Sequence, residues 1–344
     1  MIGKTNAGGG ENLDTVLATQ TTDLNNLETE INSLDDSNCS TQLKSLIDGT
    51  ATEITIPYGT TQISTSAFTC NYNLQKINIP KTVTKMAYTE KQLDWGLFYR
   101  DISLKELDLS NIEEIKVTNT EQIWTHALSQ FCLDCPLLER VYFNDNLVLP
   151  VQSDPMNQPP QSTFAGCGNL IEVNLPLSLE ILGSGFFADC YALKSLIGGW
   201  KNIRDLRRIA FGGCNSLDMP ELPEGFANLV SYGIFIECAS LKWKYLPSTI
   251  NYISQMCFAG CEGLTEMTFR GEIQEIKSQA FIGCNNLTKF SFPSNGVIPT
   301  LEAISAIPTQ ALTIEVPASL LEQWKTATNW SSLTNVTWVA LEGK

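Results

Sequence analysis

The sequence predicts a β-rich solenoid, a single array of short stacked repeats, rather than several globular domains. Two observations lead to this prediction: a motif that returns at nearly constant spacing, and an alternation of apolar and polar residues within it. The chain has 344 residues, of which 43% are hydrophobic, so it can bury a large core. A repeat array of this length forms one continuous unit, because each repeat packs only on its neighbours.

The repeated motif has the form Ala-Phe-x-x-Cys-x-x-Leu-x-x-Ile-x-Leu-Pro, with clear copies at Phe164, Phe258 and Phe281. Its anchor leucines are Leu74, Leu104, Leu138, Leu170, Leu193, Leu217, Leu241, Leu264 and Leu287. Five of the eight intervals between them are 23 or 24 residues, which identifies an internal repeat. The same register continues before the first anchor, at Ile54, and after the last one, at Ile314.

Each repeat predicts one strand and a second apolar half-turn. The Ile-x-Leu segment suits a strand whose alternate residues point inward. The proline after it ends the strand, because proline cannot donate to a ladder. A second apolar pair follows, as in Val83-x-x-Met86 and Ile273-x-x-Ile276. Since a unit this short cannot bury its apolar face alone, we expect stacked turns over 39–310 and a last repeat strand with a cap over 311–344.

The cysteines follow the same repeat. Eight of the 11 fall at or within one residue of a single repeat position: Cys70, Cys135, Cys167, Cys190, Cys214, Cys238, Cys261 and Cys284. Cysteine packs as a small apolar side chain, so the prediction is a buried column of unpaired thiols. Cys257 takes the alanine position of its repeat. Cys39 and Cys132 lie outside the pattern, and Cys39 is expected to be the most exposed thiol.

The motif resembles the BspA-like class of bacterial leucine-rich repeats, which occur on cell surfaces. The resemblance covers roughly residues 50–340 and rests on the Ala-Phe-x-x-Cys-x-x-Leu pattern. It implies a leucine-rich-repeat solenoid, a right-handed superhelix with a parallel sheet, whose usual roles are adhesion and the binding of proteins or glycans. It also implies a closing segment, for which we expect a short capping helix over 318–328, with Trp324 and Trp330 covering the last open coil.

The first 38 residues differ from the repeats. Residues 1–10 are rich in glycine and are expected to be disordered. Residues 11–38 carry a seam spaced alternately by four and three residues: Leu13, Leu17, Gln20, Leu24, Leu27, Ile31 and Leu34. This seam predicts either a coiled coil that makes the protein oligomeric or an amphipathic helix that caps the first repeat. Together with the repeats, it resembles prophage-encoded tail or surface proteins of gut bacteria, which implies a trimer that holds the solenoids outward.

Charge and composition restrict the partners. The formal net charge is −15 and no concentrated basic patch is present, so nucleic-acid binding is not expected. No apolar run approaches the roughly 20 residues of a membrane span, and no secretory leader is visible. We therefore expect no direct membrane insertion. The cell surface or a virion is the expected location, and three alternatives stay open: a leader is missing from this sequence, the protein leaves the cell by another route, or it stays inside.

Few residues point to catalysis or to a metal site. His126 is the only histidine, and near it stand only Cys132 and Cys135, whereas structural zinc needs four ligands. A Ser–His or Cys–His pair would need the same histidine. No Gly-rich phosphate loop follows a strand. We expect no metal, no cofactor and no enzymatic activity.

Three insertions indicate where a ligand would bind. The early repeat intervals of 30, 34 and 32 residues add chain at one place, at about 87–96, 116–130 and 147–162. Insertions at equivalent positions stack on one face. They would form a ridge that carries Tyr88, Trp95, Trp124, His126, Pro155 and Met156. Aromatic side chains on loops are typical of binding sites, although the same loops could be ordinary surface variation whose aromatic residues pack against each other.

The predicted function is therefore non-enzymatic recognition of a protein or glycan, or adhesion, on a cell surface or a phage tail. The alternative is an intracellular scaffold that uses its concave sheet for contacts with other proteins. The absence of a visible leader favours the scaffold or the phage component over a classical adhesin.

Overall fold

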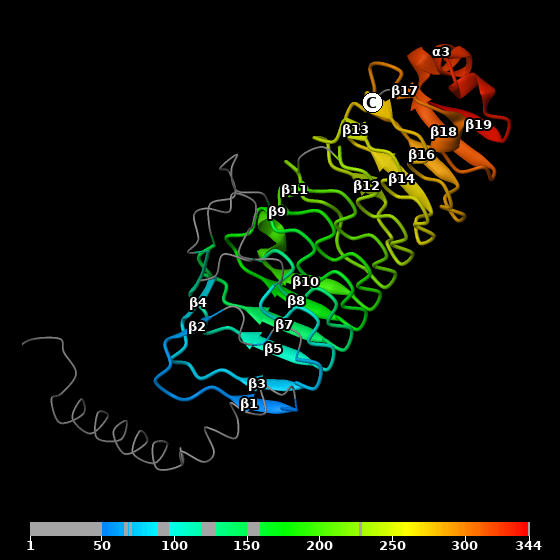
Figure 1. Ribbon diagram of the computed structural model, residues 1–344. Coiled ribbons are helices and arrows are strands. Elements are labelled where there is room, and N and C mark those ends of the chain that lie inside the picture. The colour runs from blue at the N-terminus through cyan, green and yellow to red at the C-terminus, as the bar shows by residue number, and fades with distance from the viewer. Residues whose placement is uncertain are drawn as a thin grey trace, which may run out of the picture.

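The computed structural model describes residues 50–64, 68, 71–88, 96–117, 128–149, 159–226 and 229–342. Here the chain winds as a solenoid from β1 to the C-terminal helix α3 (Figure 1). The predicted solenoid of leucine-rich repeats is confirmed, and every ladder between the described strands is parallel. The glycine-rich start and the heptad segment 11–38 lie outside the described residues, so an oligomeric coil and a capping helix both stay predictions.

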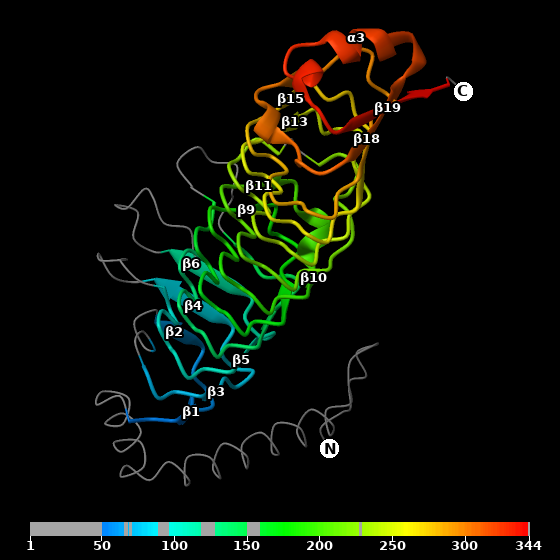
Figure 2. The same ribbon diagram turned by 90° about the vertical axis from the view of Figure 1, so that its right-hand side faces the viewer.

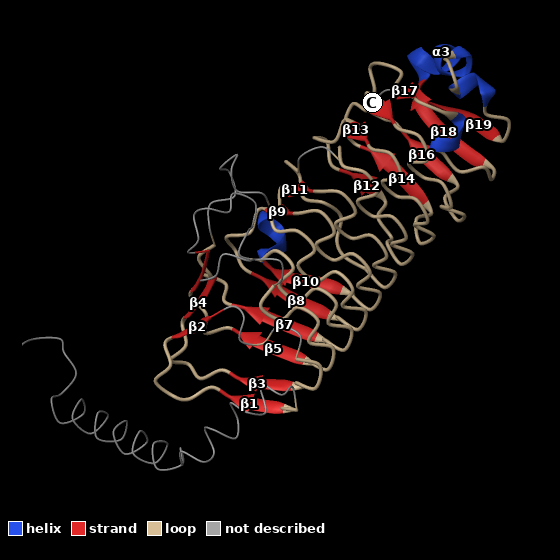
Figure 3. Ribbon diagram, in the orientation of Figure 1, coloured by secondary structure: helices blue, strands red, loops and turns tan. Residues whose placement is uncertain are grey.

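The Ile-x-Leu segments form the first row of strands, along one side of the solenoid (Figure 3). Its members are β1 (Glu53–Thr55), β3 (Lys76–Asn78), β5 (Glu106–Leu109), β7 (Arg140–Phe143), β8 (Glu172–Leu175), β10 (Ser195–Gly198), β12 (Tyr245–Leu246), β14 (Glu266–Phe269), β16 (Lys289–Ser291), β18 (Leu312–Pro317) and β19 (Val336–Leu341). They pair in three groups, β1-β3, β5-β7-β8-β10 and β12-β14-β16-β18-β19. Inward and outward residues alternate along the longer strands, as the sequence predicts.

The second apolar half-turn of each repeat forms a second row (Figure 2). It comprises β2 (Gln62–Ser64), β4 (Lys85–Tyr88), β6 (Glu114–Val117), β9 (Ile181–Leu182), β11 (Asp205–Leu206), β13 (Tyr252–Ile253), β15 (Glu275–Ile276) and β17 (Thr300–Leu301). The pairing orders are β2-β4-β6, β9-β11 and β13-β15-β17. Two short 3-10 turns accompany the rows, η1 (Gly199–Asn202) after β10 and η2 (Ile304–Ala306) after β17.

The third side of each coil is the Phe-x-x-Cys turn, which needs a left-handed residue directly before the cysteine position. This residue is Arg100, Asp134, Gly166, Asp189, Gly213, Glu237, Gly260 or Gly283, with φ between 56° and 78°. Glycine adopts this conformation without steric cost, which explains the frequent glycine there. The other residues must hold a conformation that costs them about 1 kcal/mol.

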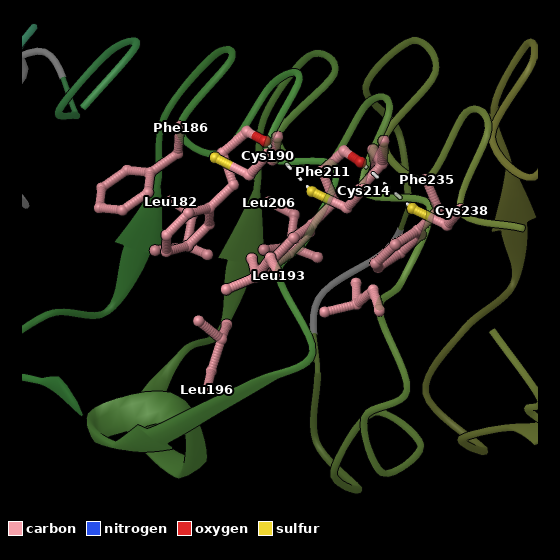
Figure 4. Packing of buried hydrophobic residues seen from close by; sticks show 14 of the residues in the cluster. Leu182, Phe186, Cys190, Leu193, Leu196, Leu206, Phe211, Cys214, Phe235 and Cys238 are labelled. Carbon is pink, nitrogen blue, oxygen red and sulfur yellow. Dashed lines mark hydrogen bonds between the residues drawn. The ribbon is translucent and has the colours of Figure 1, made fainter. Parts of the chain in front are cut away.

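The same turn aligns the thiols. Each Sγ donates a hydrogen bond of 2.8–3.1 Å to the carbonyl at the phenylalanine position one coil earlier (Figure 4). The donors are Cys135, Cys167, Cys190, Cys214, Cys238, Cys261 and Cys284, and the acceptors are the carbonyls of Phe98, Cys132, Phe164, Phe187, Phe211, Phe235 and Phe258. Every cysteine in the described part is free and buried. From Cys167 to Cys284, burial raises the pKa of each thiol of the column, to about 12 at Cys284, so these thiols are uncharged.

One cysteine is placed differently from the prediction. Cys132 does not lie outside the repeat: it takes the phenylalanine position of its coil, and its carbonyl accepts the bond from Cys167. Phe131 fills the preceding alanine position and packs edge-on against Phe98 at 5.4 Å. In this coil the bulky side chain therefore stands at the alanine position, and the small side chain stands at the phenylalanine position. Cys39 and Cys70 lie outside the described residues.

Leucines and phenylalanines fill the centre of the coils. The nine anchor leucines named above all have 0% exposure. In the C-terminal coils the rings of Phe187, Phe211, Phe235, Phe258 and Phe281 form a stack, with centroids 5.3–5.6 Å apart and interplanar angles of 5–17°. Offset stacking at this spacing adds to the burial of each ring.

The C-terminal cap is shorter than predicted. Instead of one helix over 318–328, the chain forms the 3-10 turn η3 (Ala318–Leu320), the helix α3 (Leu321–Thr326) and the 3-10 turn η4 (Trp330–Ser332). The helix stops because Ala327 is extended, with φ −69° and ψ 148°. Trp324 and Trp330 are 0% and 1% exposed and contact Phe292, with centroids 4.9 and 6.0 Å apart, so they cover the last coil.

Strand β19 was not predicted. It pairs in parallel with β18 over six residues, with Trp338 opposite Ile314. The segment lacks the Phe-x-x-Cys-x-x-Leu motif, which is why the repeat pattern did not reveal it.

Candidate functional site

Most of the predicted ridge lies outside the described residues. Trp95, Trp124, His126, Pro155 and Met156 fall in the segments 89–95, 118–127 and 150–158, and the side chain of Tyr88 is not described either. The described residues next to these segments show where the segments leave the solenoid. The three segments follow β4, β6 and the isolated bridge at Val148, which are neighbours in the second row. The ridge itself stays a prediction.

A cleft opens in the first row between β3 and β5. The amide of Lys105 donates to the carbonyl of Gln75 at 3.3 Å, and beyond this bond no ladder joins these two fully described strands. The next pair, β5 and β7, forms a continuous ladder. The opening has a volume of about 680 Å³. The row is interrupted here and again between β10 and β12, and the first interruption adjoins a concave surface lined by residues of β1, β3 and β5.

The cleft has an apolar floor. Ile77 and Ile79 line it, and Ile79 is only half-buried. In the next coils the equivalent residues, Leu109 and Leu175, have 0% exposure. The interruption thus uncovers part of the core that the other coils close.

The walls of the cleft carry both signs of charge. Lys76, Lys105, Glu106 and Asp108 all line it. Lys76 forms an ion pair with Glu53 at 3.1 Å, and the side-chain amide of Asn78 donates to the same carboxylate at 2.9 Å. The hydrogen bond from Asn78 is the main cause of the lowered pKa of Glu53, and the hydrogen bond from Lys76 is the second.

A set of exposed apolar residues, called the stripe below, occupies similar positions in several coils. It consists of Tyr72, Ile102, Leu137 and Tyr191, which lie one or two residues after the cysteine position of their coils and are 53%, 41%, 41% and 51% exposed. The coil between Leu137 and Tyr191 has Gly168 there. A Cβ on Gly168 would lie 3.4 Å from Cδ2 of Tyr191, so this ring extends over the glycine. The hydroxyl of Tyr191 donates to Asp189 at 3.2 Å, and the nearby carboxylate raises its pKa.

The stripe is confined to the N-terminal coils. In the later coils the position after the cysteine is Asn215, Ala239, Glu262 or Asn285. The exposed aromatic and aliphatic side chains of the stripe are a candidate contact surface.

Beneath the stripe, two polar residues replace thiols. Asn71 and Asp101 occupy the cysteine position of their coils and are 5% and 0% exposed. One oxygen of Asp101 accepts from the backbone amide of Asn71 at 2.8 Å, and the other has no partner among the described residues. Burial raises the pKa of Asp101 to about 9, so the carboxyl is protonated at neutral pH.

The described residues contain no group of three or more His, Cys, Asp or Glu side chains placed to hold a metal ion. Among them, too, no helix combines the length and apolarity needed to cross a membrane.

Comparisons with known proteins agree with the repeat pattern. A family model described as "BspA type Leucine rich repeat region" matches residues 45–148, 108–218 and 200–305. Among solved structures, a leucine-rich repeat protein from Bacteroides ovatus is 20% identical, with 84% of each chain covered and a TM-score of 0.43. A leucine rich cell surface protein from Faecalibacterium prausnitzii is 18% identical, with 85% of this chain and 88% of that chain covered and a TM-score of 0.35. The pneumococcal vaccine antigen PcpA is 16% identical, with 85% and 78% covered and a TM-score of 0.39. No curated protein gives a significant match.

Proposed function

Because the chain belongs to the BspA-type leucine-rich-repeat family, we propose that it recognises a protein or glycan ligand at a cell surface, without catalysis, through its N-terminal coils. The observation that supports this proposal is the exposed stripe of Tyr72, Ile102, Leu137 and Tyr191. Aromatic and aliphatic anchors of this kind provide much of the binding energy in protein interfaces. The solenoid presents them in a fixed row, so little conformational entropy is lost on binding.

The test is a binding measurement with the full chain. Dye-labelled protein is applied to cultured intestinal epithelial cells and to an array of mammalian glycans. We expect at least a tenfold loss of binding when Tyr72→Ser, Ile102→Ser, Leu137→Ser and Tyr191→Ser are combined.

The control carries the same number of exposed apolar replacements outside the stripe. These are Val230→Ser, Ile282→Ser, Val297→Ser and Ile304→Ser, whose native side chains are 40–55% exposed. The control should bind as the wild-type protein does. An equal loss in both variants, or a wild-type chain that binds neither cells nor glycans, contradicts the proposal.

The predicted ridge forms a second part of the same proposal. Trp95→Ala combined with Trp124→Ala should weaken binding in the same assay and leave the melting temperature nearly unchanged, because loop aromatics contribute to contacts more than to the core. Unaltered binding by this double variant removes the ridge from the proposed binding surface and leaves the stripe.

A further inference from the structure

We propose that the C-terminal strand β19 pairs with the same strand of a second copy of this chain. The two strands would run antiparallel about a two-fold axis, so that two solenoids join at their C-terminal ends. This inference goes beyond the proposed recognition function and does not depend on it.

The open edge of β19 gives the first argument. This strand is the last of the group β12-β14-β16-β18-β19 and lies beside β18 at the C-terminal end of the solenoid (Figure 1). The amide of Leu312 on β18 donates to the carbonyl of Asn335 at 2.9 Å, directly before β19 begins. In a parallel ladder, every second residue of a strand bonds to the same neighbour. Asn335 and the alternate residues after it, Thr337, Val339 and Leu341, therefore face β18.

The residues in between, Val336, Trp338 and Ala340, direct their backbone N–H and C=O groups away from β18. These groups have no backbone partner in the described part of the chain. A row of unpaired donors and acceptors at the edge of a sheet is a template for a further strand. The edge of β19 is therefore suited to extend the sheet.

The sequence of β19 gives the second argument. Residues 336–341, Val-Thr-Trp-Val-Ala-Leu, contain no charged residue and no proline. Together with β18, this is the longest described strand. Proteins keep edge strands from pairing by making them short or by placing charged residues and proline in them. The first strand of the row, β1, has only three residues and carries Glu53. Of these two ends, the C-terminal one is therefore suited to pairing.

The symmetry of the open groups indicates that the partner is a second copy. Val336 and Ala340 lie two residues before and two residues after Trp338. An antiparallel pair centred on Trp338 thus places each open group opposite an open group of the other copy. A two-fold contact of this kind uses the same patch on both molecules, so it closes as a dimer.

The side chains fit the same register. On the inner face, Trp338 would lie opposite Trp338 of the second copy. Its ring is half-buried against Trp324 and Trp330, with centroids 6.1 and 6.3 Å apart, and the pairing would cover more of it. On the outer face, the exposed Thr337 would lie opposite Val339, which is 36% exposed. Aromatic and β-branched pairs of this kind stabilise antiparallel strands.

The charges near β19 permit the contact. In this register Glu342 would lie opposite Thr334 of the second copy and not opposite another carboxylate. Glu315 lies beside Val339 on β18, and Lys289 forms an ion pair with it at 3.1 Å. Since each copy carries a formal net charge of −15, two copies meet most easily through a strand without carboxylates.

The experiment is sedimentation velocity of the full chain at concentrations of about 5–200 µM, a range chosen because the interface is small. We expect the mass to double reversibly as the concentration rises. Two double variants test the register. Thr337→Lys with Val339→Lys places ammonium groups opposite each other across the axis. Thr337→Glu with Val339→Lys places a carboxylate opposite an ammonium group. Directly opposed like charges destabilise a strand pair and opposite charges stabilise it.

The two double variants are matched, because both carry Val339→Lys beside Glu315 and differ only at position 337. We expect the dimer to dissociate at least tenfold more readily in Thr337→Lys with Val339→Lys. In Thr337→Glu with Val339→Lys, the dissociation constant should stay within threefold of the wild-type value. Circular dichroism and melting temperatures check the fold of both.

A second pair of variants tests the backbone. Ala340→Pro removes an amide that points to the open edge, and proline is tolerated at such a position. Ala340→Ser keeps the amide and is the control. We expect at least a tenfold weaker dimer for Ala340→Pro and less than a threefold change for Ala340→Ser. The charge variants keep the test decisive if Ala340→Pro does not fold.

Three outcomes would overturn the inference. The first is a mass that does not change up to 200 µM. The second is a mass that grows beyond twice its starting value, as a head-to-tail array would produce. The third is equal association in the two double variants, which is also the result expected if the copies associate through residues 11–38. The serine variant of the stripe should still form the dimer, so loss of ligand binding and loss of association are separate results.

Discussion

The N-terminal and C-terminal coils are built on the same motif, yet they differ in part of their ring packing and at two cysteine positions. From Phe187 to Phe281 the rings are stacked nearly parallel, and every thiol of the column bonds to the previous coil. Before them, Phe68 and Phe98 are stacked at 7°, but Phe98 and Phe131 meet edge-on at 72°, and Asn71 and Asp101 replace thiols. The first row is interrupted in both regions, between β3 and β5 and between β10 and β12. Three residues of the exposed stripe, Tyr72, Ile102 and Leu137, lie on these earlier coils, and Tyr191 lies on the coil of Phe187. The comparison predicts that substitutions in the stacked coils cost more stability than those in the earlier coils, where we propose the ligand binds.

The largest expected effect comes from breaking the stack of phenylalanines at its middle. Phe235 lies between Phe211 and Phe258, at 5.4 and 5.6 Å, and is fully buried. Phe235→Ala should cost about 3–5 kcal/mol, because it removes the ring from both neighbours and leaves a cavity. Phe68→Ala should cost clearly less, since Phe68 is 4% exposed and stacks on Phe98 at 5.7 Å near the N-terminal end of the array. Urea unfolding measures both, and equal losses would contradict the division between the two regions.

The next effect concerns Asp101 and depends on pH. Its pKa is raised to about 9 in the folded protein, against about 3.9 in an unfolded chain. The folded state therefore binds more protons between these values, and the contribution of Asp101 to stability is full below about pH 4 and declines as the pH rises toward 9.

Asp101→Asn should remove this decline and raise the free energy of unfolding at pH 7 by about 1–3 kcal/mol. Asp101→Cys, which restores the thiol of the motif, should act in the same direction. Urea unfolding at pH 5 and pH 8 is the measurement. If the free energy of unfolding changes equally between pH 5 and pH 8 in the wild-type protein and in both variants, the buried carboxyl does not cause the pH dependence of stability.

A smaller effect is expected within the thiol column. Cys238 donates to the carbonyl of Phe211 at 3.1 Å and has 0% exposure. Cys238→Ala should cost about 1–2 kcal/mol, from the lost hydrogen bond and the small void that replaces sulfur. Cys238→Ser keeps a donor and should cost less if the bond matters more than the volume. Thermal unfolding of the two variants side by side separates these contributions, and no loss in either would show that the column is not stabilising.

The smallest effect is expected at the left-handed turn residues. Glu237 has φ 61° and Gly260, one coil later, has φ 74°. Glu237→Gly should stabilise the fold by up to about 0.5 kcal/mol, because relief of the left-handed strain exceeds the added chain entropy. Gly260→Ala should destabilise it by about 1 kcal/mol for the opposite reason. Melting temperatures check both signs, and a destabilised Glu237→Gly variant would show that the turn is not strained.

The repeat itself could be predicted from the sequence because its apolar positions have a strict period. The anchor leucines and the column of thiols follow from that period alone. The interruption between β3 and β5 could not be predicted, since Ile77-x-Ile79 and Leu107-x-Leu109 fit the motif equally well. The separation of two strands depends on how successive coils stack, which a local pattern does not encode.

Two further differences have local causes. Strand β19 carries only an alternation of apolar residues, which is a weaker signal than the full motif. Cys132 was assigned outside the pattern because Phe131 occupies a position shifted by one residue. The residues of the stripe lie one or two positions after the cysteine, where the motif allows any residue. The repeat pattern therefore does not predict them.

The hydrogen-bonded thiols also bear on the redox conditions that the fold tolerates. Proteins held together by disulfides need an oxidising compartment to form. The described coils instead use reduced cysteine as a hydrogen-bond donor, and burial raises the pKa of thiols such as Cys214 and Cys284, which keeps the reactive thiolate scarce. Oxidation would have to break the contact between two coils before it reached a sulfur atom. The described solenoid thus needs no oxidant in order to fold in a reducing cytosol, and its buried thiols are protected from oxidants outside a cell.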